Sequence, residues 1–584
     1  MMRTAWVLLA VAASAAAAVN ITCAELGCGT RNASQPCACN SACSRYRDCC
    51  ADFNTTCAGR MPTPAPRAPT PPPAPADDDA PLPPPSGGAP EQIHLALTKA
   101  TDEMRVSFTT MGGAGAAAAG APAAQAASGI SARAVAAATT GAGGGGATVH
   151  SPPAVASVRY GTSAAALDRV ATGTSSTYRD GGWRGLLHTV LLRGLAPGTR
   201  YYYRPAYAGA DAPGVSSFVS AAAAGTVGSG AAATRPLVVA VVADLGSNCV
   251  DKSTWREPGC GNGTIAALTA GAAALPGTPA AFDLLLHAGD IAYTSGAQGV
   301  WDVFLRQMEP VASRVPYMVC AGNHEHYYNF SGFRHRFDMP GPGAPREGVV
   351  SVAAAAAAGA TDGASGVGAG AGGDHGAHNL WHSFDAGGAH FVGFSSEHNL
   401  TVGSPQHAWL DADLAAARAG GAVWLVAYGH RPLYCTCSDS YDCGAGEGYG
   451  AMKMRAGVEA LFEKHGVELY LTGHVHNYER TFPVDNNTAA STDPAVAYVD
   501  ARHTTHVVVG MAGDNEGLTD GFMAAPPSWS AVRHAELGWA RLTVGSDGAG
   551  AAADETLKFE YVLSSSGKVF DTFTLRKTAA AQSR

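Results

Sequence analysis

The stretch HAGDIAY at residues 287–293 decides the fold that the sequence predicts. It follows the apolar run Phe282–Leu286, and the apolar character stops abruptly at Gly289 and Asp290. A short run that ends in this way is typical of a buried parallel strand, which here delivers the Asp290 carboxylate to its C-terminal edge. Open α/β sheets bind ligands at that edge. Asp290 is therefore the first candidate functional residue.

Four further apolar runs are followed by a small residue and then by an oxygen or nitrogen donor. The runs cover residues 237–242, 315–319, 423–426 and 467–471, and the donors after them are Asp244, Asn323 with His324, His430, and His474 with His476. One such donor alone is best explained as a polar residue in a strand-to-helix loop. Five strand ends carrying only Asp, Asn, Tyr and His predict a metal site, and Asp290 is the candidate to bridge two ions about 3.5–4 Å apart.

Taken together, these blocks resemble the five motif blocks of the purple acid phosphatases. The blocks are Asp244 with Gly246, GDIAY at 289–293, GNHE at 322–325, a His after VAYG at position 430, and GHVH at 473–476. Their order and spacing fit the family over about residues 236–575. Tyr293 separates this family from other metallophosphoesterases of similar architecture. Ala427 departs from the Val that the family often has there, but that position is not a ligand.

The resemblance implies a pair of metal ions and their ligands. It implies that one metal is held by Asp244, Tyr293 and His476, the other by Asn323, His430 and His474, with Asp290 shared. Hard carboxylate and phenolate oxygens suit Fe(III), whereas two imidazoles and an amide suit a divalent ion such as Zn, Mn or Fe(II). With both ions in place, a metal-bound hydroxide is expected to attack phosphorus in line, with activity at acidic pH.

His324, inside the GNHE block, is the candidate catalytic residue. We expect it to hydrogen-bond the substrate phosphate or the leaving group, and the alternative is a capping histidine beside a ligand. Plant-type members of the family carry His residues about ten positions beyond the fourth-block ligand. Asp439 and Ser440 stand there in this chain, so the group that protonates the leaving group is left open.

The expected function is therefore that of a secreted acid phosphatase acting on phosphate monoesters, with a phosphodiesterase as the nearest variant. The alternative is an extracellular adhesion or matrix protein in which the catalytic domain is a passive scaffold. The net charge is −9 and no cluster of Lys or Arg stands out, which argues against a nucleic-acid partner. No internal apolar run is long enough to span a bilayer.

At 584 residues the chain is too long for one domain, and the prediction is a multidomain protein. It combines a small disulfide-rich domain, a fibronectin-III-like β-sandwich, and an α/β metallophosphoesterase domain with two packed mixed sheets flanked by helices. The predicted parts are a signal peptide (1–18), a Cys-rich domain (19–60), a Pro-rich linker (61–90), the sandwich (91–225, with a Gly/Ala insert at 112–146) and the catalytic domain (236–577, with an insert at 353–373).

The Cys-rich segment holds eight of the fourteen cysteines of the chain. A segment this short needs disulfides and an oxidising compartment, which agrees with a signal peptide and secretion. Its spacing resembles a somatomedin B domain, which implies an extracellular protein partner, whereas a zinc knuckle is disfavoured because the segment has no His. The sequence leaves the pairing open. The cysteines are Cys23, Cys28, Cys37, Cys39, Cys43, Cys49, Cys50 and Cys57.

Several local sequence patterns carry further expectations. LAPGTRYYY at 195–203 places a Tyr just after a turn, as in the tyrosine corner of sandwich domains. The helix that carries Trp301 and Met308 is predicted to end before Pro310. His382 is expected to be exposed, and Cys320 to be a buried thiol. Sequons that would be glycosylated if exposed begin at Asn20, Asn32, Asn54, Asn262, Asn329, Asn399 and Asn486.

Overall fold

The computed structural model describes residues 88–111, 154–222, 235–247, 261–278, 281–341, 379–438, 440, 442–443, 449–490, 492, 497–546 and 554–582. These residues belong to one compact unit, residues 78–584. The predicted signal peptide, the Cys-rich domain with its eight cysteines, nearly all of the Pro-rich linker and both Gly/Ala inserts lie outside the described residues. So do the sequons at Asn20, Asn32 and Asn54.

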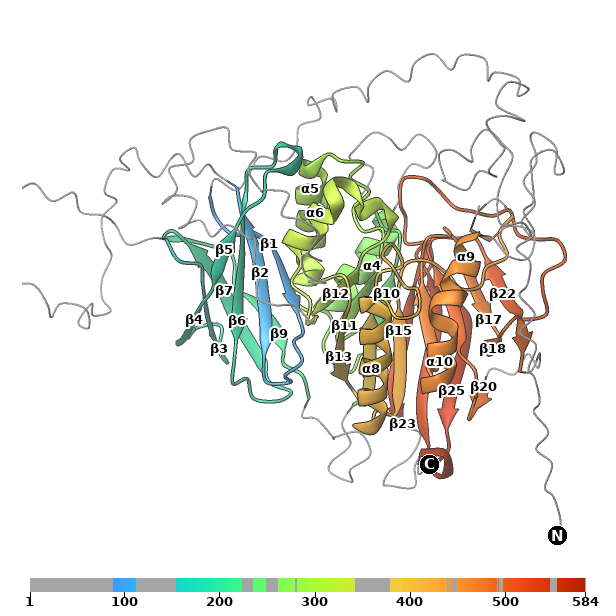
Figure 1. The fold of residues 1–584 in the computed structure, drawn as a ribbon. Coiled ribbons are helices and arrows are strands. Elements are labelled where there is room, and N and C mark those ends of the chain that lie inside the picture. The colour runs from blue at the N-terminus through green and yellow to red at the C-terminus, as the bar shows by residue number, and fades with distance from the viewer. Residues whose placement is uncertain are drawn as a thin grey trace, which may run out of the picture. The chain divides into compact units, whose positions relative to one another are not determined.

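The first described domain is an antiparallel β-sandwich, as predicted (Figure 1). One sheet has the order β1-β2-β6-β5, and the other has the order β4-β3-β7-β8 with β9 on β7. The strands are β1 (Glu91–Ala96), β2 (Met104–Thr110), β3 (Ser157–Gly161), β4 (Arg169–Thr172), β5 (Thr174–Ser176), β6 (Leu186–Leu192), β7 (Arg200–Tyr207), β8 (Ala210–Asp211) and β9 (Ser216–Val219). The Tyr201 hydroxyl accepts a hydrogen bond from Ala196 N at 2.9 Å, which closes the predicted corner.

Two seven-stranded mixed sheets form the second domain. The first has the order β12-β11-β10-β23-β24-β25-β20, and the second has the order β13-β14-β15-β16-β21-β17-β22. The strands of the first are β10 (Leu237–Val242), β11 (Leu284–Ala288), β12 (Tyr317–Cys320), β20 (Ala497–Val499), β23 (Gly538–Ser546), β24 (Glu555–Leu563) and β25 (Val569–Lys577). Those of the second are β13 (His382–Ala386), β14 (Ala389–Gly393), β15 (Trp424–Tyr428), β16 (Leu469–Thr472), β17 (Tyr478–Thr481), β21 (Thr505–Val509) and β22 (Ser530–His534).

The strands that precede the candidate site residues run parallel within each sheet. β10, β11 and β12 are parallel neighbours in the first sheet, and β14, β15, β16 and β21 are parallel neighbours in the second. Their side chains are buried on both faces, which explains why they read as continuous apolar runs rather than as alternating patterns. Because these parallel neighbours point the same way, their carboxyl ends share one edge of each sheet.

Helices cover the sheets, and α8 and α10 run side by side in Figure 1. The α-helices are α4 (Asn262–Ala273), α5 (Gln298–Ala312), α6 (Tyr327–Arg336), α8 (Pro405–Ala419), α9 (Tyr449–Met454), α10 (Ala460–His465) and the short α11 (Ala579–Gln582). Ser404 caps α8 by accepting a hydrogen bond from His407 N at 3.3 Å. The predicted end of α5 before Pro310 is wrong, since the helix continues to Ala312. Pro310 lies in the last turn, where its missing N–H costs at most one helical hydrogen bond.

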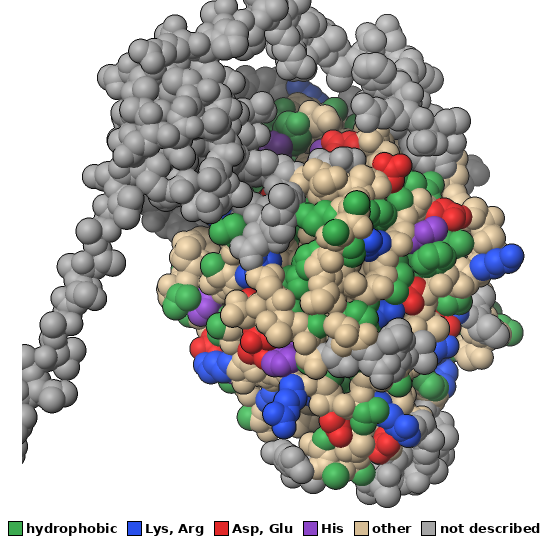
Figure 2. Space-filling model, turned by 90° about the vertical axis from the view of Figure 1, so that its right-hand side faces the viewer, with side chains coloured by type: hydrophobic (Ala, Val, Ile, Leu, Met, Phe, Trp, Pro, Cys, Tyr) green, Lys and Arg blue, Asp and Glu red, His purple; other side chains and the backbone are tan. Residues whose placement is uncertain are grey.

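The basic side chains are dispersed on the face of the molecule in Figure 2. Lys and Arg side chains lie there singly or in small groups among acidic and apolar side chains. None of the helices in the described part of the chain is both long and apolar enough to cross a membrane.

The prediction that His382 is exposed is wrong. Its ring is buried in β13, and Nε2 lies 2.5 Å from the Tyr428 hydroxyl. Burial lowers the pKa of His382 to about 3, so the ring is neutral. The glycine-rich stretch before His382 suggested an exposed loop, but strand β13 begins at this residue.

His390 in β14 joins two carboxylates and makes the stability of the fold depend on pH. Burial alone would lower the pKa of His390, but hydrogen bonds to Asp385 (2.7 Å) and Asp413 (3.0 Å) outweigh it and raise the pKa to about 9. The imidazolium therefore stabilises the fold below about pH 6.5, and this contribution is lost as the pH rises through about 9. Asp385 is exposed, which weakens the pair.

We expect His390→Gln to lower the free energy of unfolding by roughly 1–2 kcal/mol at about pH 6 and by much less at about pH 10. Urea unfolding of the variant and the wild type at both pH values measures the difference. A loss of the same size at both pH values would contradict the ion-pair explanation.

Candidate metal centre

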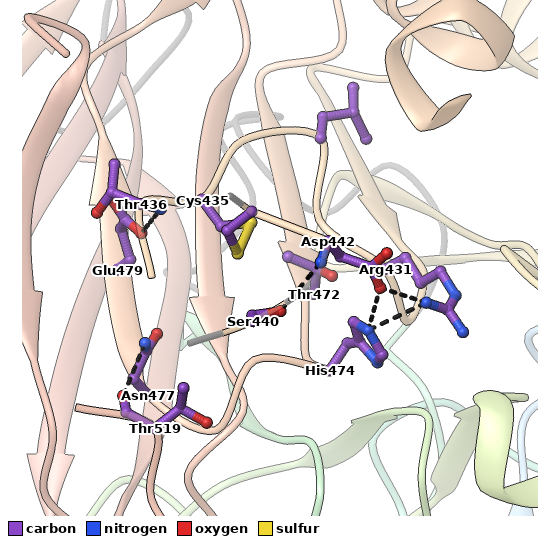
Figure 3. Close-up of a disulfide and its surroundings, with 12 residues drawn as sticks. Arg431, Cys435, Thr436, Ser440, Asp442, Thr472, His474, Asn477, Glu479 and Thr519 are labelled. Atoms are coloured by element: carbon purple, nitrogen blue, oxygen red, sulfur yellow. Dashed lines mark hydrogen bonds and ion pairs between the residues drawn. A yellow bond between two sulfur atoms is a disulfide. The ribbon is translucent and has the colours of Figure 1, made fainter. Parts of the chain in front are cut away.

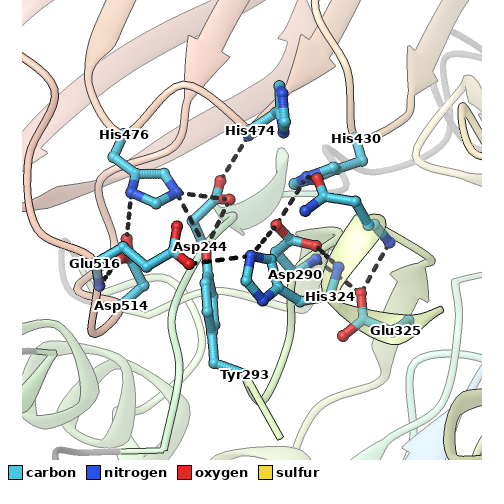
Figure 4. Close-up of polar contacts among 12 residues, drawn as sticks. Asp244, Asp290, Tyr293, His324, Glu325, His430, His474, His476, Asp514 and Glu516 are labelled. Carbon is cyan, nitrogen blue, oxygen red and sulfur yellow. Dashed lines mark hydrogen bonds and ion pairs between the residues drawn. The ribbon is translucent and has the colours of Figure 1, made fainter. Parts of the chain in front are cut away.

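Five strand ends deliver the predicted site residues to one place (Figure 4). In the first sheet, Asp244 lies just beyond β10, Asp290 beyond β11 and Asn323 beyond β12. In the second sheet, His430 lies just beyond β15 and His474 beyond β16. Tyr293 and His476 complete the set from the same loops as Asp290 and His474. All seven candidate ligands are thus brought together by the two sheets.

Asp244, Tyr293 and His476 form one group of contacts. The Tyr293 hydroxyl lies 3.1 Å from Asp244 Oδ1 and 3.1 Å from His476 Nε2, and His476 Nε2 lies 3.5 Å from Asp244 Oδ1. The other ring nitrogen of His476, Nδ1, donates to the Gly517 carbonyl at 3.0 Å. Nε2 is therefore the ring nitrogen that faces the carboxylate and the phenol.

Asp290, Asn323 and His430 form a second group. His430 Nε2 lies 3.0 Å from Asp290 Oδ2 and 3.0 Å from Asn323 Oδ1, while its Nδ1 donates to the Ala288 carbonyl at 3.0 Å. Asp290, His430 and His474 each offer a ligand atom, and these atoms lie within 4.8 Å of one another. Carboxylate, amide and imidazole atoms thus converge here, an arrangement that suits a cation.

The electrostatics of the site favour positive charge. Burial alone would lower the pKa of both His430 and His476, but facing carboxylates outweigh it and raise the pKa to about 9 and about 10. Burial, reinforced by Asp244, raises the pKa of the Tyr293 phenol well above 10, so only a strongly acidic cation could displace its proton. The residues present therefore fit a pair of cations.

The backbone at these residues is strained, as is common at functional sites. Positive φ angles occur at Asp244 (56°), Asp290 (51°), Tyr293 (51°) and His474 (71°). Two glycines make room for the clustered carboxylates. A Cβ at Gly322 would collide with the Asp290 carboxylate, and one at Gly473 would collide with that of Asp244. The glycines of the GNHE and GHVH blocks are therefore required by the close approach of their neighbours.

His324 lies at the mouth of the site, beside the ligands. Its ring packs on Tyr293 with centroids 4.2 Å apart, and Nε2 lies 3.4 Å from Glu516 Oε1 and 3.8 Å from Asp290 Oδ2. The side chain is 20% exposed, so it reaches solvent while it contacts the centre. This position suits a group that exchanges protons with a substrate.

Sequence reasoning missed several charged residues that hold the ligands in place. Glu325 accepts backbone hydrogen bonds from Asp290, Ile291 and Gly322 at 2.8–2.9 Å. Asp514 Oδ2 lies 3.2 Å from His476 Nδ1. Asp514 follows the apolar run of β21 after the short stretch GMAG at 510–513, a signal similar to the one that marked Asp244 and Asp290. Arg431 and Asp442, which contact His474, are marked by no comparable pattern in the sequence.

The remaining predicted residues of the described chain lie at the surface or in the core. The sequon asparagines Asn262, Asn329, Asn399 and Asn486 are exposed, which meets the stated condition for glycosylation. Cys320 is a buried thiol, as expected, and Cys435 pairs with Cys443.

Family models match four segments of the chain. Residues 237–478 match the calcineurin-like phosphoesterase family, residues 90–221 the purple acid phosphatase N-terminal domain, and residues 503–572 the iron/zinc purple acid phosphatase-like C-terminal domain. Residues 21–60 match the somatomedin B domain.

Curated relatives carry names of both active and inactive proteins. The chain is 36% identical over 276 residues to acid phosphatase type 7 of Homo sapiens, covering 45% of this chain and 55% of that protein. It is 33% identical over 298 residues to probable inactive purple acid phosphatase 1 of Arabidopsis thaliana, covering 50% of this chain and 43% of that protein. The matched segments thus span about half the length of these relatives.

A solved structure shares the fold. The structure of a purple acid phosphatase from yellow lupin (Lupinus luteus) seeds matches with a TM-score of 0.61 at 22% sequence identity. The match covers 85% of this chain and 76% of the lupin chain.

Proposed function

Because this chain belongs to the purple acid phosphatase family of metallophosphoesterases and carries a somatomedin B domain, we propose that it is a secreted acid phosphatase acting on phosphate monoesters. The observation that carries the proposal is the convergence of seven buried or half-buried ligand residues from two sheets. Some Arabidopsis relatives are named as probable inactive phosphatases, so the activity of this chain needs a direct test. Strained, charge-rich clusters of this kind cost stability, which cation binding offsets.

The contacts support the assignment of ligands to two ions. Asp244, Tyr293 and His476 would hold Fe(III), and Asn323, His430 and His474 would hold a divalent ion, with Asp290 shared. When bound, the two cations would neutralise the phosphoryl oxygens and supply an acidified water. The chain's own contribution is to fix the donors in advance: the carbonyls of Ala288 and Gly517 orient the two imidazoles, and Glu325 fixes the backbone around Asp290.

The test is hydrolysis of p-nitrophenyl phosphate and of bis-p-nitrophenyl phosphate by metal-loaded protein across the acidic and neutral range. We expect faster turnover of the monoester, with an optimum below neutrality. Faster turnover of the diester would identify the phosphodiesterase variant. Hydrolysis of neither compound would favour a passive scaffold, with the somatomedin B domain binding an extracellular partner.

His324 is proposed to donate a proton to the leaving group. His324→Ala is expected to lower kcat by about 10²–10³-fold while the metal content stays unchanged. The loss should be larger for an alkyl phosphate than for p-nitrophenyl phosphate, because the alkoxide needs the proton more. Kinetics with both substrates, and with His503→Ala as a control at a surface histidine paired with Glu463, measure the effect. Equal losses for the two substrates would contradict the proton-donor role.

A further inference from the structure

A disulfide-closed loop lies against the GHVH block. Cys435 and Cys443 are bonded, and with Val475 and Val508 they form a small buried apolar cluster. Val475 stands between His474 and His476 in the sequence. The disulfide therefore packs on the turn that carries two of the candidate ligands. Figure 3 shows the disulfide together with Asp442 and His474.

Asp442, next to the second cysteine of this loop, binds a candidate ligand directly. Its Oδ2 contacts His474 Nε2, and it is the closer of the two partners of that nitrogen, since Arg431 Nη1 lies 3.0 Å away. The imidazole therefore donates Nε2–H to Asp442. Its Nδ1 then carries the lone pair that a metal requires.

Arg431 anchors the Asp442 carboxylate beside His474. The guanidinium binds Glu397 through two hydrogen bonds of 2.8 and 3.1 Å and also contacts Asp442 Oδ2. Asp442 and Arg431 are 7% and 23% exposed, so the group is largely withdrawn from water. The carboxylates of Glu397 and Asp442 thus balance the positive charge of Arg431. Asp442 accepts from His474 as well.

The start of the loop is anchored as well. Thr436 donates from its N and its Oγ1 to the Glu479 carboxylate, both at 2.7 Å, and its carbonyl accepts from Met523 N at 2.9 Å. Glu479 belongs to β17, which follows the GHVH block directly. The loop is therefore tied to the second sheet at one end and to the candidate ligand at the other.

We propose that the Cys435–Cys443 loop is a positioning element of the metal centre, in which the disulfide holds Asp442 and Asp442 orients the His474 imidazole toward the divalent cation. Asp442 is a positioning residue, because it acts through His474. The inference rests on the metal centre of the proposed function and adds a dependence of that centre on an oxidised disulfide.

The test is the affinity of metal-loaded full-length protein for Zn²⁺, measured by competition with a graded chelator. Asp442→Asn is expected to weaken one divalent site by about 10–100-fold and to leave the iron content unchanged. Asp411→Asn is the matched control. Asp411 also accepts a hydrogen bond from a histidine, His465 at 2.5 Å, but it lies on α8 and contacts none of the candidate ligands. Equal affinities of the two variants would overturn the inference. A wild-type protein that binds no metal would overturn the proposed function, and this inference with it.

A cysteine variant tests whether the disulfide acts on the metal site through Asp442 or only stabilises the fold. Cys435→Ser/Cys443→Ser is expected to weaken the same site, and adding Asp442→Asn should weaken it little further, because both changes act on one contact. Fully additive losses would overturn the proposed link between the disulfide and Asp442. Circular dichroism establishes whether the cysteine variant folds, and if it does not, Asp442→Asn decides alone because it keeps the disulfide.

Discussion

Asp290→Asn is expected to abolish hydrolysis of p-nitrophenyl phosphate, with a loss on the order of 10³-fold or more. Asp290 lies at the centre of the contacts, with Oδ2 3.0 Å from His430 Nε2 and Oδ1 accepting from His324 N at 2.7 Å. Asn preserves the shape but removes the negative charge that both cations would share. Opposing charges surround this carboxylate and, against its burial, lower the pKa of Asp290, so it is ionised throughout the working range.

The measurement pairs steady-state kinetics with metal content. The variant is expected to retain at most one ion per chain. Asp411→Asn should behave as the wild type, since Asp411 lies on α8 and pairs with Lys464 and His465 of α10. Thermal unfolding checks that Asp290→Asn is folded. Wild-type turnover by a folded Asp290→Asn would remove Asp290 from the catalytic centre.

Asp302→Ala is expected to destabilise the fold by about 3–5 kcal/mol, because it leaves a buried guanidinium without its carboxylate. Arg336 at the end of α6 is fully buried and lies 2.8 Å from Asp302 on α5. Two residues of the sandwich complete the group: Trp183 donates to Asp302 at 3.0 Å, and the Tyr178 hydroxyl accepts from Arg336 at 3.0 Å. The group thus joins the sandwich to the catalytic domain.

Urea unfolding measures this loss of stability, and two further variants show whether it comes from the unpaired charge. Asp211→Ala, at an exposed ion pair with Arg159, should cost at most about 1 kcal/mol. Asp302→Ala combined with Arg336→Met should be more stable than Asp302→Ala alone, because the unpaired charge is then gone. A cost for Asp302→Ala as small as that for Asp211→Ala would show that the buried pair contributes little.

The sequence predicted the parallel strands and their ends well, because burial on both faces leaves a simple apolar run. β11 ends at Ala288 and β16 at Thr472, and the candidate ligands follow at once. Periodicity alone could not bring Asp290 beside His430, which lies on the other sheet. The resemblance to a family supplied that pairing, and the structure places their side chains 3.0 Å apart.

The rest depended on long-range contacts that leave little trace in the sequence. His382 looked exposed because of the glycines before it, yet Tyr428 of a neighbouring region buries it. Asp442 lies in a loop without periodicity, and its importance comes from His474, 32 residues away. Pro310 looked like a helix end, but in the last turn its effect is small.

The most direct measurement is the metal content of purified wild-type protein by elemental analysis. We expect about two ions per chain, one iron and one zinc, manganese or second iron, because seven candidate ligands from two sheets lie together in two groups. A chain that binds fewer than one ion after loading with iron and zinc would contradict it.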